Sequence, residues 1–158
     1  MRKIVFTMLK RGVRLLSGHG IGKLYLAKTI WPRAFSHLRP DVVEVQGNKM
    51  FLRPTDSLSP FLAYGLYEPF QTEFVKKEVK RSDVVLDIGA HIGYYTLIFA
   101  RIVGEEGKVY AFEPDPNNFA LLKKNVEING YKNVILVQKA VANKTGSLRL
   151  YLSEDNTG

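Results

Sequence analysis

The sequence predicts an α/β fold built on a parallel sheet, and three observations support this. Short apolar runs at residues 84–88, 108–113 and 133–138 alternate with segments of helical character. Uninterrupted apolar runs are typical of strands that are buried on both faces of a parallel sheet. The chain has 158 residues, of which 46% are hydrophobic and 24% charged, as in one ordinary globular domain. The order strand, helix, strand, helix, strand then implies right-handed crossovers.

Residues 1–40 are predicted to form a basic helical extension of the domain, which occupies residues 41–158. The extension has nine Lys or Arg and no Asp or Glu, whereas the domain has fourteen basic and fifteen acidic residues. Such asymmetry favours an anionic partner. A helical cap packed on the domain with solvated lysines is the first interpretation, an anionic membrane surface is the second, and nucleic acid is less favoured than either.

No apolar run reaches the ~18–20 residues that a membrane-spanning helix needs. The first residues also lack the pattern of a secretory signal. We therefore expect a cytoplasmic protein, peripheral to a membrane where the extension binds one. The chain has no cysteine, which excludes disulfides, thiolate metal sites and a cysteine nucleophile. We predict no metal site.

The region before the first parallel strand is predicted to contain a β-hairpin and a helix. Residues 42–52 have the pattern of a hairpin with its turn at Gly47-Asn48, and a polar connection follows at residues 56–60. Residues 70–80 are predicted to form a helix. Phe70, Phe74 and Val75 are expected on one face of this helix at helical spacing, with Val79 as a further candidate.

Two further helices connect the parallel strands. Residues 92–103 have helical character. The second helix is predicted to begin at Asp115-Pro116, because Asp caps free N–H groups and Pro is tolerated in the first turn. It ends at Asn129-Gly130, a typical C-terminal signal. A fourth strand is predicted at residues 147–152.

The loop after the first parallel strand is the predicted ligand site, because ligands bind at the carboxyl ends of strands in such sheets. Gly89 lets the backbone approach a ligand without a Cβ, and Gly93 permits close packing of the helix on a strand. The free N–H groups at the start of that helix are expected to favour a negative or polar group.

Glu113 is the second predicted element, twenty residues after Gly93 at the end of the second strand. A carboxylate there can accept hydrogen bonds from both hydroxyls of a ribose. A dinucleotide loop needs glycine where His91 stands. Asp87 would repel a pyrophosphate but suit the ammonium group of a methionine moiety. The pattern therefore favours S-adenosylmethionine over NAD, and a fragment of an NAD-binding oxidoreductase is an alternative.

Several motifs resemble the FkbM family of S-adenosylmethionine-dependent methyltransferases, over residues 42–158. They are residues 65–69 (GLYEP), 85–97 (VLDIGAHIGYYTL), 107–116 (GKVYAFEPDP) and 140–143 (AVAN) with Gly146. The resemblance implies a Rossmann-like class I methyltransferase fold and methyl transfer to a hydroxyl oxygen, here of a small molecule or a glycan. His91 stands where Asn is more usual in the family.

The resemblance also implies which residues bind the cofactor. The candidate cofactor-binding residues are Asp87, Gly89, Ala90, His91, Gly93, Glu113 and Ala140. The loop residues would line the methionine end, Glu113 would hold the ribose, and the segment near Ala140 would contact the adenine. We identify no catalytic base.

Members of the FkbM family continue beyond a fourth core strand into an Asp-Val-Glu-Gly-type motif, which does not occur before Gly158. We therefore expect the cofactor-binding part of a methyltransferase, truncated after the third core strand. Strand 84–88 would then be an open edge of the sheet. A non-catalytic truncated remnant is the further alternative.

Overall fold

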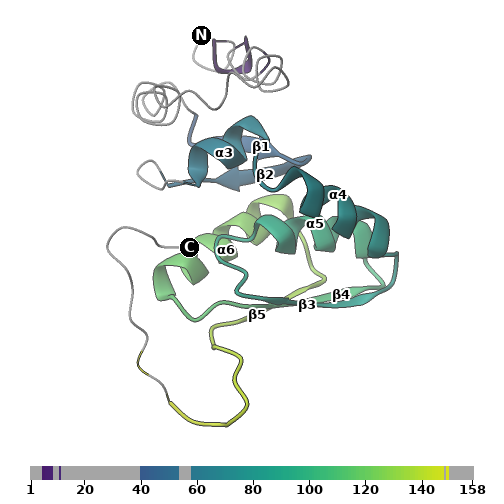
Figure 1. Ribbon diagram of the computed structural model, residues 1–158, viewed down its shortest axis with the longest axis vertical. Coiled ribbons are helices and arrows are strands. Elements are labelled where there is room, and N and C mark those ends of the chain that lie inside the picture. The colour runs from purple at the N-terminus through teal and green to yellow at the C-terminus, as the bar shows by residue number, and fades with distance from the viewer. Residues whose placement is uncertain (1–4, 9–10, 12–39, 54–57, 148, 150–158) are drawn as a thin grey trace. The chain divides into compact units, whose positions relative to one another are not determined.

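The computed structural model describes residues 5–8, 11, 40–53, 58–147 and 149, which belong to two compact units. The first unit runs to Pro69 and the second begins at Phe70. Figure 1 labels the elements of both units. The basic extension predicted at residues 1–40 lies almost wholly outside the described residues, although residues 5–8 and 11 are helical. In the described part of the chain, no helix is long and apolar enough to cross a membrane.

The first unit contains the predicted hairpin, formed by the antiparallel strands β1 (Val42–Val45) and β2 (Asn48–Phe51). The turn lies at Gln46 and Gly47, one residue earlier than predicted. Both turn residues have positive φ, at 51° and 77°, which matches the right-handed twist of two paired strands. Asn48 is therefore the first residue of β2, where it is buried and pairs with Val45.

A short helix, α3 (Ser59–Tyr64), replaces the end of the polar connection that we predicted at residues 56–60. Proline in its first turn is compatible with a helix start, and Gly65 ends it in the left-handed conformation. Tyr64 is buried, and its ring centroid lies 5.7 Å from that of Phe6. Packing of this kind stabilises a helix too short to form by itself.

The second unit contains the predicted parallel sheet, with the spatial order β3, β4, β5. The strands are β3 (Val84–Ile88), β4 (Lys108–Phe112) and β5 (Val134–Val137). Two crossover helices connect them, α5 (Tyr94–Val103) and α6 (Pro116–Asn129). Figure 1 shows both helices on the same face of the sheet. The α/β fold with a parallel sheet is therefore confirmed.

The prediction that residues 84–88 are buried on both faces is wrong. Val84, Leu86 and Ile88 are 63%, 59% and 60% exposed, whereas Val85 packs against the core formed with Val109. Right-handed crossovers that proceed in one direction across a sheet place their helices on one face. Among the described residues, the opposite face of β3 is left uncovered.

The helix predicted at residues 70–80 is present as α4 (Pro69–Glu78), but two of the four apolar residues predicted to share a face are exposed. Phe70 and Phe74 are 86% and 63% exposed, while Val75 is half-buried. The buried residue is Thr72, whose hydroxyl forms a hydrogen bond of 2.8 Å with the Tyr94 hydroxyl. This polar contact sets the rotation of α4.

The remaining predictions concern the ends of α6 and a fourth strand. Asp115 accepts a hydrogen bond from the Asn118 N–H, and Gly130 ends the helix in the left-handed conformation, so both predicted boundaries of α6 are confirmed. In the strand predicted at residues 147–152, Ser147 and Arg149 are described and are not in a strand. Residues 148 and 150–152 lie outside the described residues.

Candidate functional site

The predicted glycine loop connects β3 to α5 in a strongly bent conformation. Gly89, His91 and Gly93 have positive φ, at 81°, 50° and 96°. A Cβ on Gly89 would have no neighbour within 4 Å, so glycine is required there by the backbone conformation and faces open space. His91 is half-buried and adopts the left-handed conformation that Asn tolerates better than most residues.

Four N–H groups of this loop are donated within the protein. The N–H groups of Gly89 and Ala90 both donate to the Phe112 carbonyl, each at 2.9 Å. The Gly93 N–H donates to the Ala90 carbonyl at 2.8 Å, and the His91 N–H donates to Glu113 Oε2 at 2.7 Å. The donors of Gly89, Ala90 and His91 fasten the loop to the end of β4, whereas the Gly93 N–H closes a turn within the loop.

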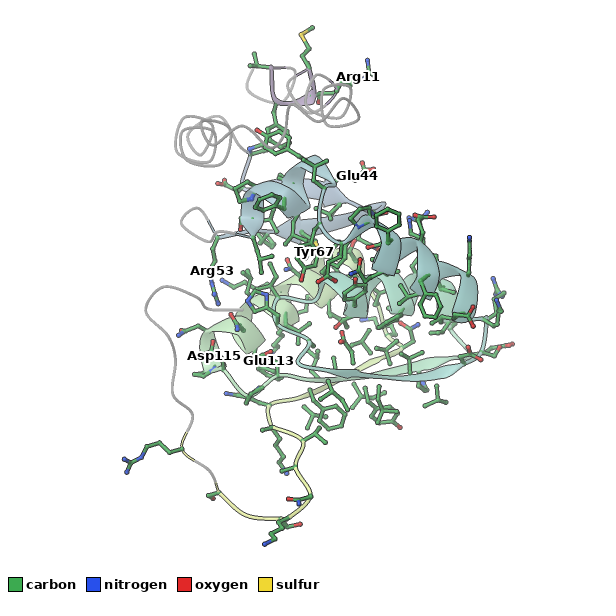
Figure 2. The ribbon with its side chains drawn as sticks, viewed as in Figure 1. Arg11, Glu44, Arg53, Tyr67, Glu113 and Asp115 are labelled. Carbon is green, nitrogen blue, oxygen red and sulfur yellow. The ribbon has the colours of Figure 1, made fainter. Side chains whose placement is uncertain are left out.

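The fold brings Glu113 to the glycine loop, as the sequence predicted from their places at the ends of two adjacent strands. Glu113 is 5% exposed. Its Oε2 accepts from the His91 N–H, and its Oε1 accepts from the Asp115 N–H at 2.9 Å. Figure 2 labels Glu113 and Asp115 where β4 leads into α6. Each Glu113 oxygen keeps a second lone pair for a further donor.

Asp87, near the end of β3, has a structural partner that sequence reasoning missed. The buried Thr96 donates from its hydroxyl to Asp87 Oδ2, and its backbone also hydrogen-bonds the carboxylate. Burial raises the pKa of Asp87 above its usual value of 3.8, and the charge of Glu113 raises it further, whereas the bonds from Thr96 lower it. The signal in the sequence was a threonine in the first turn of the helix that follows the loop.

Helix α6 supports the end of the loop that leads into α5, at Ile92 and Gly93. Asn125 is fully buried, and its side-chain amide donates to the Ile92 carbonyl at 2.8 Å. A Cβ on Gly93 would lie 2.7 Å from Leu122 Cδ1. The close packing predicted for Gly93 is therefore against helix α6 and not against a strand. Neither Asn125 nor Leu122 was identified from the sequence, because a contact between helices leaves no local pattern.

Ala140 is exposed and lies three residues after Val137, the last residue of β5. The Glu113 N–H donates to the Val137 carbonyl at 3.1 Å, so β5 ends at the same edge of the sheet as Glu113. The seven candidate residues thus all belong to segments at the carboxyl ends of the three strands. Their roles in binding a cofactor stay predictions.

Comparisons with known proteins indicate the family of the chain. Residues 69–147 match the family model described as the TRM5/TYW2 methyltransferase domain. A protein-L-isoaspartate O-methyltransferase from Ignicoccus hospitalis is 35% identical over 60 residues, which are 38% of this chain and 28% of that protein. The enzyme of the same name from Methanococcoides burtonii is 42% identical over 53 residues, 34% of this chain and 26% of that protein.

Among solved structures, a SAM dependent methyltransferase from Aquifex aeolicus is 34% identical. The match covers 43% of this chain and 37% of that one, with a TM-score of 0.41. The chain matches only about a quarter of the length of the two curated relatives.

Proposed function

Since this chain belongs to the TRM5/TYW2 methyltransferase domain family and so carries an S-adenosylmethionine-dependent methyltransferase domain, we propose that S-adenosyl-L-methionine binds at the loop of residues 89–93. We further propose that the acceptor is a hydroxyl oxygen of a small molecule or a glycan. The cofactor supplies an electrophilic methyl group on a sulfonium, and the protein orients the reactants.

The observation that carries this proposal is the hydrogen bond between the His91 N–H and Glu113 Oε2. It joins the glycine loop to the acidic residue that we expect at the ribose, so one ligand can contact both. The buried carboxylate retains lone pairs that could accept hydrogen bonds from ribose hydroxyls.

The charges of the site favour a cationic ligand. Asp87 and Glu113 are both acidic, and the charge of Glu113 raises the pKa of Asp87. The ammonium and sulfonium groups of S-adenosylmethionine would relieve this repulsion. A pyrophosphate would increase it, and it would find the N–H groups of Gly89, Ala90 and His91 already donated within the protein. The site therefore gives an NAD-binding alternative no support.

Two observations support an oxygen as the acceptor atom. The resemblance to the FkbM family favours an oxygen, and the two curated relatives described above are named O-methyltransferases. A further relative from Sulfolobus acidocaldarius, 43% identical over 53 residues, is named a probable cobalt-precorrin-6B C(15)-methyltransferase, whose acceptor is a carbon. The basic residues 1–40 would bring the domain to an anionic membrane surface, where a lipid-linked acceptor could be found. We assign no residue as a catalytic base.

Calorimetric titration of the purified chain with S-adenosylhomocysteine, the demethylated cofactor, tests the proposal. We expect binding that E113A and G89V abolish or weaken at least about tenfold. The exposed Glu127 on α6 offers a matched control, since E127A removes the same charge away from the loop. Circular dichroism shows whether each variant is folded.

Other results of this titration would contradict the role of Glu113 or the proposed cofactor site. Equal affinity of E113A and the unaltered chain would remove Glu113 from the site. Binding of NAD in place of S-adenosylhomocysteine, or no binding by the folded chain, would overturn the proposed cofactor site.

A further inference from the structure

The turn between β4 and α6, residues 113–115, contains four carboxylate oxygens, and three of them have partners supplied by the fold. Glu113 Oε1 accepts from the Asp115 N–H, and Glu113 Oε2 accepts from the His91 N–H. Asp115 Oδ1 accepts from the Asn118 N–H at 2.7 Å. Asp115 Oδ2 is the exception: it is buried, and it has no hydrogen-bond partner among the described residues.

The burial of Asp115 makes this unpaired oxygen costly. The residue is only 6% exposed. A buried acceptor without a donor lacks the hydrogen bonds that water would supply in the unfolded chain, and a carboxylate is the most expensive acceptor to leave in that state. Unsatisfied groups of this kind in native proteins call for an explanation, and a ligand is one.

Capping of α6 does not explain the second oxygen. The cap uses Oδ1 alone, and Ser or Asn caps a helix as well as Asp does. The residue between the two acids is Pro114, which has no N–H, so the turn itself has no donor at that position for Oδ2. A carboxylate at residue 115 therefore provides an acceptor that the helix does not need.

The position of Asp115 indicates which ligand would use this acceptor. Its backbone N–H is bonded to Glu113, the residue that we place at the ribose, so the two acids belong to one small site. Figure 2 shows both side chains at the junction of β4 and α6. An adenosine presents two kinds of neutral donor, the ribose hydroxyls and the adenine amino group.

We propose that Asp115 Oδ2 accepts a hydrogen bond from a hydroxyl or amino group of the cofactor's adenosine, which makes Asp115 a second acid of the nucleoside site. The inference rests on the proposed function. Because Oδ2 is buried in the chain without ligand, this proposal requires that the atoms covering it move when the donor binds. The new bond then forms in surroundings from which water is excluded, where hydrogen bonds are strong.

The variant D115S separates ligand binding from capping, because serine retains a capping oxygen and lacks Oδ2. We expect D115S to bind S-adenosylhomocysteine about tenfold more weakly than the unaltered chain. Its melting temperature without ligand should be equal or higher, since an unpaired buried oxygen has been removed. D115A is the matched control that loses both oxygens, and it should lower the melting temperature as well as the affinity.

Analogues of S-adenosylhomocysteine identify the donor. One set lacks the 2′ or the 3′ hydroxyl, and another carries hypoxanthine in place of adenine and so lacks the amino group. The analogue without the relevant donor should bind the unaltered chain about as weakly as D115S binds S-adenosylhomocysteine. D115S should weaken that analogue no further, because the two changes remove the same hydrogen bond.

Two results would overturn the inference. Unchanged affinity in D115S would show that Asp115 only caps α6, and a loss in D115S that is additive with every analogue would show that Oδ2 contacts none of these groups. Either result leaves the proposed function intact, provided that the unaltered chain binds S-adenosylhomocysteine. Failure of the unaltered chain to bind would remove the proposed function and this inference together.

Discussion

At the scale of single residues, the carboxylate of Asp87 already has hydrogen bonds within the protein. The hydroxyl and the backbone of Thr96 bond to it at the start of α5. A carboxylate has about four lone-pair positions, so it can bond to Thr96 and still attract an ammonium group. Asp87 can therefore bond to Thr96 of α5 and to the ammonium group of the proposed cofactor at the same time.

The proposed contact between Asp87 and the ammonium group predicts a pH dependence of binding. The pKa of Asp87 is raised above 3.8, chiefly by burial. Only the ionised carboxylate attracts the ammonium, so the affinity for S-adenosylhomocysteine should rise as the pH increases through that raised pKa and then level off. Titration calorimetry at a series of pH values from about 4 to 8 measures this, with the lower limit set by the usual Asp pKa.

D87N is the control for this pH dependence. It keeps the size of the side chain and cannot ionise, so its affinity should be lower and independent of pH over the same interval. A pH dependence of equal size in D87N would mean that another group titrates, and the ammonium would then have a different partner.

His91 illustrates what a residue pattern can and cannot indicate. Its place in the loop was evident from the sequence, but its φ of 50° was not, because non-glycine residues seldom adopt positive φ. The bond from its N–H to Glu113 holds it in this conformation. An Asn at this position would reach the same conformation with less strain.

At the scale of elements, the start of α5 depends on a close approach to α6. Gly93 has a φ of 96°, and a Cβ there would lie 2.7 Å from Leu122 Cδ1. We expect G93A to lower the free energy of unfolding by about 2–5 kcal/mol, since left-handed strain contributes about 1–2 and overpacking about 1–3 kcal/mol. Urea unfolding followed by circular dichroism measures the difference.

Two other glycines separate the contributions to this loss. Gly130 has a φ of 71° with open space around it, so G130A should show the strain alone, about 1–2 kcal/mol. Gly146 is exposed with no neighbour within 4 Å, and G146A should change stability by less than about 0.5 kcal/mol. Equal losses of unfolding free energy in G93A and G130A would mean that the Leu122 side chain moves away from the new Cβ at residue 93 without a loss of stability.

Elements with local signals were predictable, and elements that depend on distant contacts were not. Asp115 and Gly130 mark the two ends of α6, and each does so through a hydrogen bond with a nearby residue. The local sequence therefore determines both boundaries of this helix. The rotation of α4 depends on the bond between Thr72 and Tyr94, 22 residues apart. Helical spacing shows which residues share a face, but it does not show which face meets the core.

At the scale of the whole molecule, the described residues of the second unit form a sheet with helices on one face (Figure 1). The residues of β3 that point away from the helices are Val84, Leu86 and Ile88, and the neighbouring Tyr110 of β4 is 37% exposed. Exposed apolar patches of this kind favour association. The sequence indicated the three strands, but the one-sided arrangement follows from the direction of both crossovers, which apolar runs do not specify.

We expect the purified chain to self-associate reversibly through this sheet face. L86K should reduce the association, because a lysine at the centre of the patch must lose hydration when two faces meet. Sedimentation velocity over a range of concentrations measures it. F70K is the matched control, since Phe70 on α4 is also exposed and receives the same charge. An equal reduction in F70K would attribute the effect to net charge and not to the sheet face.

The bonds that fasten the glycine loop to β4 have a consequence for the entropy of binding. Gly89, Ala90 and His91 all donate their N–H groups to Phe112 or Glu113, so the loop takes its shape when the sheet forms. A loop that is ordered by folding loses little conformational freedom when a ligand arrives. A substitution that loosened this attachment would leave every side chain that faces the ligand in place, yet it would weaken binding because the ligand would then have to order the loop.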